Sequence, residues 1–433
     1  MRHAVSFRDL AGRRVGVFGV GIEGRAAAAR LAAEGCEVVL VDDDPAATGT
    51  PGVLATSDAG AAALRRCDAV VKSPGISRYR EDVTALEHAG VPVLGGVAMW
   101  LEETDRSRVI CVTGTKGKST VTTVAAHLAR GLGVPAVVAG NLGVPPFDPG
   151  LALDGRLVVL ETSSFQATDV AHSPDVVAVT SLGDDHLDWH GTPARYHADK
   201  LSLTSQPGAR HTVIADTPQL RAHRDQLGGE VVLTEGDAAL AAALGLVGRH
   251  GASNAGVAVA ALRAAGVAGS DDPARRLEAA RGYVPLPGRF REIARHGGVR
   301  FIDDSLATNP LPTIAALEAV GDARLALLVG GHDRGVDYGE LVAAICARPG
   351  ATVVVTLPDN GPAIGERVAA RCSVQVVDAK DVADGVSAAV EWLAGEGVLL
   401  LSPAAPSFSQ FRSWAERSAA FAEAVAGLGD QPA

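Results

Sequence analysis

Short runs of apolar residues alternate with stretches of helical spacing along the whole chain. Runs rich in Val, Leu and Ile predict strands buried on both faces, as in parallel sheets that helices cover. The first two runs, residues 14–21 and 37–42, flank a helix-like stretch at residues 25–34. Further strand-like runs lie at residues 68–75, 91–95, 109–113, 157–161, 175–180, 212–216, 299–303, 325–331, 352–356 and 397–402, with an alanine-rich helical stretch at 253–265.

One of these runs leads directly into a glycine loop. Val109 to Thr113 read as a buried strand, the loop follows, and Lys118-Ser119-Thr120 begin a helix. In such a loop, backbone N–H groups and the helix N-terminus point at phosphate oxygens. Lys118 can reach the outer phosphates, and the Ser119 hydroxyl can bind magnesium. The first glycine is Gly114, so the loop is shorter than the general P-loop pattern, but its position favours nucleotide binding over a solvated turn.

A second glycine pattern lies near the N-terminus. Gly19, Gly21 and Gly24 follow the first strand, and Asp42 ends the second one. This spacing matches the dinucleotide fingerprint of a βαβ unit. Taken alone it would favour a nicotinamide-dependent oxidoreductase, an alternative that leaves the loop at residues 114–120 without a role.

Together these patterns predict an α/β fold in three domains, each with a mainly parallel sheet. We expect a Rossmann-like domain at residues 1–107, a central P-loop ATP-binding domain at 108–287 and a Rossmann-like C-terminal domain at 288–433.

Other polar residues stand where strands end. Glu161 is placed as a magnesium ligand downstream of a P-loop, which we favour over the alternative that it caps a helix. His186 lies in a segment dense in Asp and His, but magnesium prefers oxygen ligands. Lys200, taken alone, reads as a solvated surface residue. Arg289 and Asp304 could face a nucleotide or pair with each other.

Composition narrows the function classes. Among 433 residues, 47% are hydrophobic and the net charge is −11, which excludes a general nucleic-acid binder. We find neither an apolar signal segment nor an apolar run of the ~20 residues that cross a bilayer, and we expect a cytoplasmic protein without a membrane partner. The odd number and wide spacing of the cysteines predict free buried thiols in a reducing compartment rather than disulfides or a zinc site: Cys36, Cys67, Cys111, Cys346 and Cys372.

Several motifs, in this order, resemble those of the Mur ligase family, whose members use ATP to add amino acids to UDP-N-acetylmuramoyl precursors of peptidoglycan. The resemblance covers essentially the whole chain and rests on residues 113–120, Gly140-Asn141-Leu142-Gly143, residues 161–166, Asp185-His186-Leu187-Asp188, Lys200, Pro287-Gly288-Arg289 and Asp304-Ser305. The N-terminal glycine domain and residues 71–76 resemble the glutamate-adding branch, which acts on UDP-N-acetylmuramoyl-L-alanine.

The resemblance implies roles for individual residues. The implied catalytic residues are Lys118, Glu161, His186 and Lys200. Two Mg²⁺ ions would be held by Ser119, Glu161, His186 and Lys200, with Lys200 carbamylated. The implied ATP contacts are Gly114, Thr115, Lys116, Gly117, Lys118, Ser119, Thr120, Asn254, Arg289 and Asp304. The first domain would bind the UDP substrate, with contacts from Gly21, Ile22, Asp42, Ser73 and Asn141. The last domain would bind glutamate, with contacts from Thr308, Arg334, Ser407 and Trp414.

The chain departs from the D-glutamate enzymes mainly in the last domain. Leu306 and Arg334 stand at lysine positions, Ser409 replaces an acid, and Trp414 replaces a phenylalanine. Gly251 replaces an asparagine in an ATP contact segment. An arginine fork fixes a carboxylate differently from a lysine, and a reversed stereocentre would need a rebuilt clamp. A set of other segments resembles the variant that attaches L-glutamate, whose product a separate epimerase then inverts: Lys72, Thr115-Lys116 and residues 185–191, 199–203, 331–335 and 405–408.

We therefore favour L-glutamate, with D-glutamate as the alternative, and we expect a monomer. Two further alternatives remain, of which the first shares the central motifs. A folate-type polyglutamate ligase would lack the N-terminal glycine domain, and a non-catalytic ATP-binding switch would release no phosphate.

Overall fold

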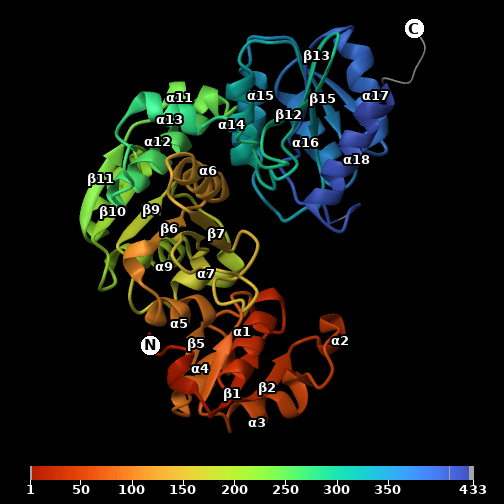
Figure 1. Ribbon diagram of the computed structural model, residues 1–433. Coiled ribbons are helices and arrows are strands. Elements are labelled where there is room, and N and C mark those ends of the chain that lie inside the picture. Colours follow the sequence, from red (N-terminus) through yellow and green to blue (C-terminus); the bar gives the residue numbers. More distant parts are fainter. Residues whose placement is uncertain (1, 409, 429–433) are drawn as a thin grey trace. The chain divides into compact units, whose positions relative to one another are not determined.

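The computed structural model describes residues 2–408 and 410–428 and contains three mainly parallel sheets (Figure 1). It divides into two compact units. One unit comprises Met1–Leu244 and Gly251–Tyr283, and the other comprises Gly245–His250 and Val284–Ala433. The first unit contains two of the sheets and the second unit contains the third.

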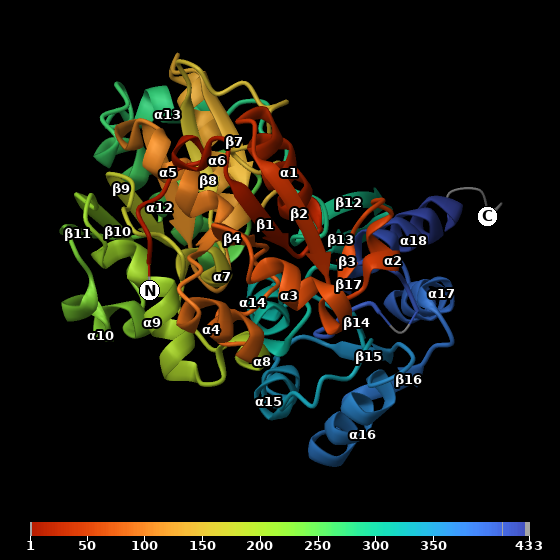
Figure 2. The same ribbon diagram turned by 90° about the horizontal axis from the view of Figure 1, so that it is seen from below.

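The first sheet is parallel throughout, with the strand order β3-β2-β1-β4-β5. Its strands are β1 (Arg14–Phe18), β2 (Glu37–Asp42), β3 (Leu54–Ala55), β4 (Ala69–Lys72) and β5 (Val93–Gly95). Its helices are α1 (Ile22–Ala33), α2 (Pro45–Thr48), α3 (Ala61–Leu64), α4 (Glu81–His88) and α5 (Gly96–Glu103). Helices α1 and α3 lie on opposite faces of the sheet (Figure 2).

The second sheet is also parallel, in the order β11-β10-β9-β6-β8-β7. Its strands are β6 (Val109–Thr113), β7 (Ala136–Gly140), β8 (Leu157–Glu161), β9 (Val176–Val179), β10 (His211–Ala215) and β11 (Glu230–Thr234). Its helices are α6 (Lys118–Gly131), α7 (Ser164–Ala167), α8 (Leu187–His190), α9 (Pro193–Ser205), α10 (Pro218–Ala222), α11 (Ala238–Ala243), α12 (Gly248–Ala264) and α13 (Pro273–Ala279).

The third sheet has the order β12-β13-β17-β14-β15-β16, and only its edge pair β12–β13 is antiparallel among the described residues. Its strands are β12 (Arg291–His296), β13 (Gly298–Asp303), β14 (Leu325–Val329), β15 (Thr352–Thr356), β16 (Gln375–Asp378) and β17 (Glu396–Leu401). Its helices are α14 (Pro310–Val320), α15 (Gly339–Cys346), α16 (Gly361–Arg371), α17 (Val382–Leu393) and α18 (Trp414–Gly427).

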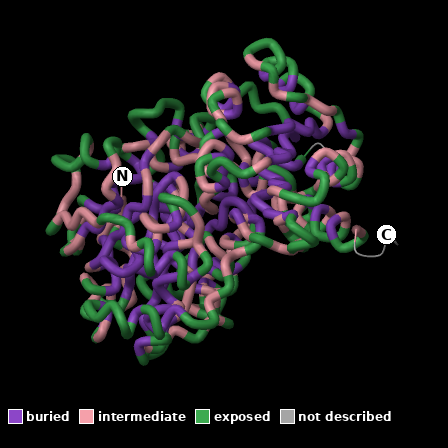
Figure 3. The backbone as a smooth tube through the Cα atoms, turned by 90° about the horizontal axis from the view of Figure 1, so that it is seen from above, coloured by how far each residue is buried: buried purple, intermediate pink, exposed green. Residues whose placement is uncertain are grey.

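The apolar runs form the cores of these sheets. Every residue of β6, β14 and β15 is buried, as expected for strands that helices cover on both faces. Along the tube of Figure 3, such buried purple stretches are separated by exposed green turns. The predicted α/β class with mainly parallel sheets is confirmed, while the domain limits at 107 and 287 stay predictions. Within the part of the chain that is described, no helix combines the length and the apolar character needed to cross a membrane.

The cysteine prediction is wrong for one pair. Cys346, at the end of α15, forms a disulfide with Cys372, which follows α16. Their Cα atoms lie 5.7 Å apart, within the range that a disulfide spans. Helices α15 and α16 pack against each other, so residues 26 positions apart in the sequence meet at their ends. Cys36, Cys67 and Cys111 are free thiols, as predicted, but only Cys67 and Cys111 are buried, while Cys36 is half-buried.

Two glycines of the first turn have different structural roles. A Cβ atom on Gly24 would lie 1.9 Å from the Gly19 carbonyl oxygen, whereas no described atom lies within 4 Å of a Cβ built on Gly21. We expect Gly24→Ala to lower the free energy of unfolding by about 3 kcal/mol, at the upper end of overpacking costs. Urea unfolding followed by circular dichroism measures this loss.

Gly21→Ala is the matched control for that variant. Gly21 precedes α1 with φ −73° and ψ −159°, which alanine adopts without strain. The control is expected to lose no more than about 1 kcal/mol, the cost of a poorer N-cap. Equal losses in the two variants would contradict the steric role of Gly24.

Candidate active site

The loop between β6 and α6 is tied to the loop that follows β9. The Thr115 N–H donates to the Ser181 carbonyl at 3.0 Å, and the Lys116 N–H donates to the Ser181 hydroxyl at 2.8 Å. Position 117 requires glycine for two reasons. Its φ is +88°, and an added Cβ would lie 2.5 Å from Asn254 Oδ1. The structure therefore brings Asn254, from α12, directly beside the phosphate-type loop.

Two lysines converge on one carbonyl oxygen of this loop. Lys118 Nζ donates to the Gly114 oxygen at 2.8 Å, and Lys200 Nζ donates to the same oxygen at 3.0 Å. Lys200 comes from α9 and is only 2% exposed, so the interpretation as a surface lysine does not hold. Burial, aided by the nearby Lys118 charge, holds the pKa of Lys200 well below its usual value, which favours the neutral amine.

Glu161 ends β8, close enough to Lys200 for its charge to act on that lysine. Its Oε1 accepts a hydrogen bond from Asn141 Nδ2 at 2.7 Å, so Asn141 lies at the central sheet rather than in the first one. Its Oε2 is buried and has no hydrogen-bond partner among the described residues. An orphaned carboxylate oxygen suits Mg²⁺, and Glu161 therefore fits the predicted metal role. The described residues contain no cluster of three or more His, Cys, Asp or Glu side chains placed to hold a metal, so such an ion would also need substrate or water oxygens.

His186 lies at the start of α8 in a left-handed conformation, with φ +51°. Burial lowers its pKa, as do the charges of Lys200, Lys116 and Lys118, while Asp185 opposes the shift. Asp185 also accepts from Lys116 Nζ at 3.2 Å. A neutral imidazole is the form that can bind a metal, and its site here is surrounded by cations.

Trp189 links this region to the first sheet. Its Nε1 donates to the Pro74 carbonyl at 3.1 Å, and its own carbonyl accepts from the Ser77 hydroxyl at 3.1 Å. Its ring stacks on Phe165 at 4.6 Å between centroids, and Phe165 in turn contacts the His186 ring edge-on at 4.9 Å. A continuous row of rings therefore joins the loop after β4 to the loop that carries His186.

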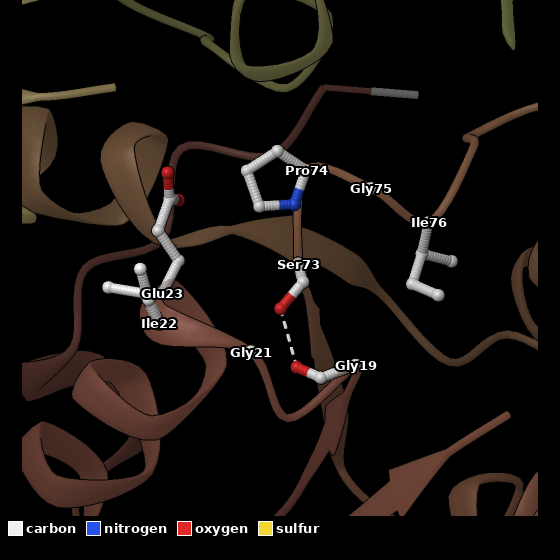
Figure 4. A pocket seen from close by; sticks show the side chains of 8 residues that line it. All are labelled: Gly19, Gly21, Ile22, Glu23, Ser73, Pro74, Gly75 and Ile76. Carbon is white, nitrogen blue, oxygen red and sulfur yellow. Dashed lines mark hydrogen bonds between the residues drawn. The ribbon is translucent and has the colours of Figure 1, made fainter. Parts of the chain in front are cut away.

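The loop after β4 forms one wall of a cavity of about 310 Å³ at the carboxyl end of the first sheet (Figure 4). The lining residues are Gly19, Gly21, Ile22, Glu23, Ser73, Pro74, Gly75 and Ile76. The Ser73 hydroxyl donates to the Gly19 carbonyl and fixes the glycine turn. Asp42 Oδ2 accepts from the Val20 N–H at 2.6 Å, which makes Asp42 a support of the turn rather than a lining residue. Of the predicted substrate contacts, the cavity contains Gly21, Ile22 and Ser73.

The third sheet carries its own buried carboxylate. Asp304 follows β13 and accepts from the Phe290 N–H at 3.0 Å and from the Ser402 hydroxyl at 2.7 Å. Burial raises its pKa to about 7, although both hydrogen bonds and the charge of Arg289 oppose the shift. Arg289 and Asp304 therefore lie near each other, in the unit that does not contain residues 114–120.

The predicted glutamate residues follow neighbouring strands of this sheet. Thr308 comes after β13, Arg334 after β14 and Ser407 after β17, and these strands are adjacent. The Arg334 guanidinium lies 5.9 Å from the centre of the Phe408 ring, and the His332 N–H donates to the Pro406 carbonyl at 2.8 Å, so the last two loops contact each other. Trp414 instead packs on Gly288, where an added Cβ would lie 2.7 Å from the indole ring. The Ser409 departure falls outside the described residues.

The chain matches models of two known protein domains. Residues 112–236 match the Mur ligase middle domain, and residues 288–405 match the Mur ligase, glutamate ligase domain. The UDP-N-acetylmuramoyl-L-alanine–L-glutamate ligase of Salinispora tropica is 38% identical and aligns over 96% of this chain and 98% of its own length. The chain belongs to the Mur ligase family. A ligase of the same name from Xanthomonas axonopodis pv. citri is 34% identical, over 96% of this chain and 95% of its own length.

Among solved structures, the UDP-N-acetylmuramate-alanine ligase of Thermotoga maritima shares the fold. Its TM-score is 0.56 at 17% identity, covering 96% of this chain and all of that one. As a Mur ligase, the chain is an enzyme of the acid–amino-acid ligase type. None of the comparisons described here supports the oxidoreductase alternative, because the fingerprint at Gly19, Gly21 and Gly24 occurs within a Mur ligase chain.

Sequence reasoning missed one residue that organises the Mur ligase C-terminal loops. Arg417, on α18, is 1% exposed and donates to the carbonyls of Ser305 at 2.8 Å and Ala405 at 2.9 Å, and to that of Gly330 at 3.5 Å. It therefore joins the loops after β13, β17 and β14. Burial lowers its pKa to about 10. No spacing rule signals this role, because an arginine in a mixed helix normally reads as a surface residue.

Proposed function

We propose that this Mur ligase forms the amide bond between UDP-N-acetylmuramoyl-L-alanine and L-glutamate with ATP, in the synthesis of peptidoglycan precursors. The observation that carries the proposal is the convergence of Lys118 and buried Lys200 on the Gly114 carbonyl, with Glu161 of β8 near Lys200. The substrate names come from relatives that align over nearly the whole chain. Our preference for L-glutamate over D-glutamate rests on the same relatives and on Arg334.

The reaction would proceed in two steps. The alanine carboxylate attacks the γ-phosphorus of ATP, which gives an acyl phosphate and ADP. The glutamate amine then attacks the acyl carbon, loses a proton and expels phosphate. Backbone N–H groups at the start of α6 and the Lys118 ammonium would stabilise charge on the transferring phosphoryl group, because the N–H groups of Thr115 and Lys116 already donate to Ser181. The predicted ATP contacts Thr115, Lys116, Thr120, Asn254, Arg289 and Asp304 belong to the same proposal.

We assign the proposed Mg²⁺ ions to the residues predicted from the sequence. Ser119 and Glu161 would hold one ion, and Glu161, His186 and carbamylated Lys200 the other, so that the ions offset charge on the phosphates when bound. The orphaned Oε2 of Glu161 supports this assignment. A neutral Lys200 amine can add to carbon dioxide with loss of a proton, and the carbamate would supply the oxygen ligands that Mg²⁺ prefers.

We propose that Thr308, Arg334 and Ser407 hold the incoming glutamate. The three residues follow adjacent strands, at the edge of a parallel sheet where ligands commonly bind. Arg334 can bind a carboxylate through two parallel N–H groups. Trp414, which packs on Gly288, would be a further contact to the glutamate. The monomeric state, the cytoplasmic location and a downstream epimerase stay predictions.

The decisive test offers L- and D-glutamate separately. Phosphate release is measured with UDP-N-acetylmuramoyl-L-alanine, ATP and Mg²⁺. We expect L-glutamate to support the higher kcat/KM by at least about 100-fold, because a wrong stereocentre leaves polar groups of the clamp unpaired. Preference for D-glutamate would overturn the stereochemical part. Absence of phosphate release with either isomer would overturn the ligase reaction and favour a non-catalytic ATP-binding switch.

A further inference from the structure

Glu23 is the one ionisable side chain among the described residues that line the cavity of the first sheet. It stands in the first turn of α1, directly after Ile22, whose side chain is 67% exposed at the cavity. In Figure 4 its carboxylate lies on one side of the cavity and Ile76 on the other. None of the sequence motifs pointed to Glu23, because the glycine fingerprint leaves this position free.

The groups around Glu23 determine the pKa of its carboxyl group. On its protein side, Oε1 accepts a hydrogen bond from Gln166 Nε2, which comes from α7. The nearby cation, Lys72, already pairs with Asp169 at 2.8 Å, and Asp169 also faces Glu23. Burial therefore outweighs the Gln166 hydrogen bond and the Lys72 charge, and the pKa of Glu23 rises to about 7. A carboxylate in such surroundings gains from a further hydrogen-bond donor.

A phosphate group is a poor partner for this carboxylate, because two anions at close range repel. Backbone N–H groups where the glycine turn meets α1 are better placed to face a diphosphate. The part of a ligand that passes Glu23 should instead carry O–H or N–H donors. A nucleotide sugar with an attached amino acid carries both kinds of group, the diphosphate and the donors.

We propose that Glu23 is a specificity-determining residue that accepts a hydrogen bond from a hydroxyl or amide N–H of the sugar–amino-acid portion of the acceptor substrate. This inference rests on the proposed function. Glu23 distinguishes the complete acceptor from UDP alone, because only the complete acceptor offers this hydrogen-bond donor. Gln166, on α7, orients the carboxylate through its hydrogen bond to Oε1.

Glu23→Gln tests the proposal because it keeps the size of the side chain and an oxygen that can still accept from Gln166. We expect KM for UDP-N-acetylmuramoyl-L-alanine to rise about 10- to 100-fold, the contribution of a hydrogen bond to a charged group. The values of kcat and of KM for ATP and glutamate should stay close to wild type. The Kd for UDP alone should not rise in the variant.

The pH profile supplies a second readout. The ratio kcat/KM reports groups of the free enzyme. In the wild type, kcat/KM for the acceptor should fall as the pH is lowered through about 7, because Glu23 then gains a proton. In Glu23→Gln the part of this fall that Glu23 causes should be absent, which leaves only the contribution of other groups that titrate near pH 7, such as Asp304. Glu81→Gln, an exposed residue of α4, is the matched control and should retain the wild-type profile.

Binding measurements keep this test separate from the ligase assay. Titration calorimetry compares UDP-N-acetylmuramoyl-L-alanine with UDP on both proteins and needs no turnover. A loss confined to the complete acceptor supports the proposal even where no phosphate is released. An unchanged Kd for the acceptor, or equal weakening of the acceptor and UDP, overturns it. Tighter binding of both ligands also overturns it, because Glu23 would then act only by repulsion.

Discussion

Replacing Lys200 with alanine is expected to lower the rate of phosphate release by at least about 10²-fold, the loss typical of one group that stabilises developing charge. Lys200 Nζ and Lys118 Nζ lie within 3.0 Å of the same Gly114 oxygen, so two ammonium charges there would repel. Burial favours the neutral form of Lys200, the form that can become a carbamate. If the carbamate is the working group, a small carboxylate can replace part of its function.

The rescue experiment separates this role from a structural one. Activity of Lys200→Ala should return in part when formate or acetate is added, whereas the exposed control Lys380→Ala should be fully active and insensitive to either acid. A ¹³C signal from labelled bicarbonate should appear in the wild type and be absent in Lys200→Ala. Full activity of Lys200→Ala without added acid would disprove the carbamate role, and so would equal stimulation of the control.

The largest effect on stability is expected for Asp169→Ala. Asp169 Oδ2 pairs with Lys72 at 2.8 Å, and Oδ1 pairs with Arg78 at 2.9 Å, between side chains that are 0%, 3% and 11% exposed for Lys72, Asp169 and Arg78. Removing the carboxylate takes the anion away from buried Lys72, while Arg78 keeps its pair with Glu87 at 3.6 Å. Breaking such a pair typically costs about 3–5 kcal/mol, and we expect a loss in this range from urea unfolding.

Two comparisons test that account. Lys72→Met should cost less than Asp169→Ala, because Arg78 still pairs with the carboxylate. Asp216→Ala, which removes an exposed pair with Arg221, should leave stability nearly unchanged. If Lys72→Met is the more damaging variant, the shared-anion role assigned to Asp169 is wrong.

Much of the fold could be predicted because its signals are local. Strands such as β6 and β14 are continuous apolar runs, and the glycines at positions 114 and 117 have positive φ, which side chains with a Cβ rarely adopt. The edge strands β11 and β16 are only partly buried and carry weaker signals. These two strands form because they pair with β10 and β15, and such pairing cannot be predicted from the sequence of one segment alone.

Only part of the candidate site could be predicted from the sequence. The loop at residues 114–120 and Glu161 could be predicted because both follow the carboxyl ends of strands, where ligands commonly bind. Lys200 is a single residue on a helix without a distinctive pattern, and only the family resemblance pointed to it. Arg417 and Glu23 have no motif at all. Most of their partners, such as the Gly330 and Ser305 carbonyls and the Gln166 amide, lie more than 80 positions away in the sequence, so their roles depend on how the segments pack.

By itself the sequence determined the α/β class, the phosphate-type loop and membership of a ligase family, because these depend on residue type and short spacing. Only the tertiary structure decided that Lys200 is buried beside Lys118, that Cys346 and Cys372 pair, and that a carboxylate rather than a cation faces the first cavity. The physical reason is that burial, charge pairing and disulfide formation depend on distances between remote segments. These distances exist only after the sheets and helices have packed.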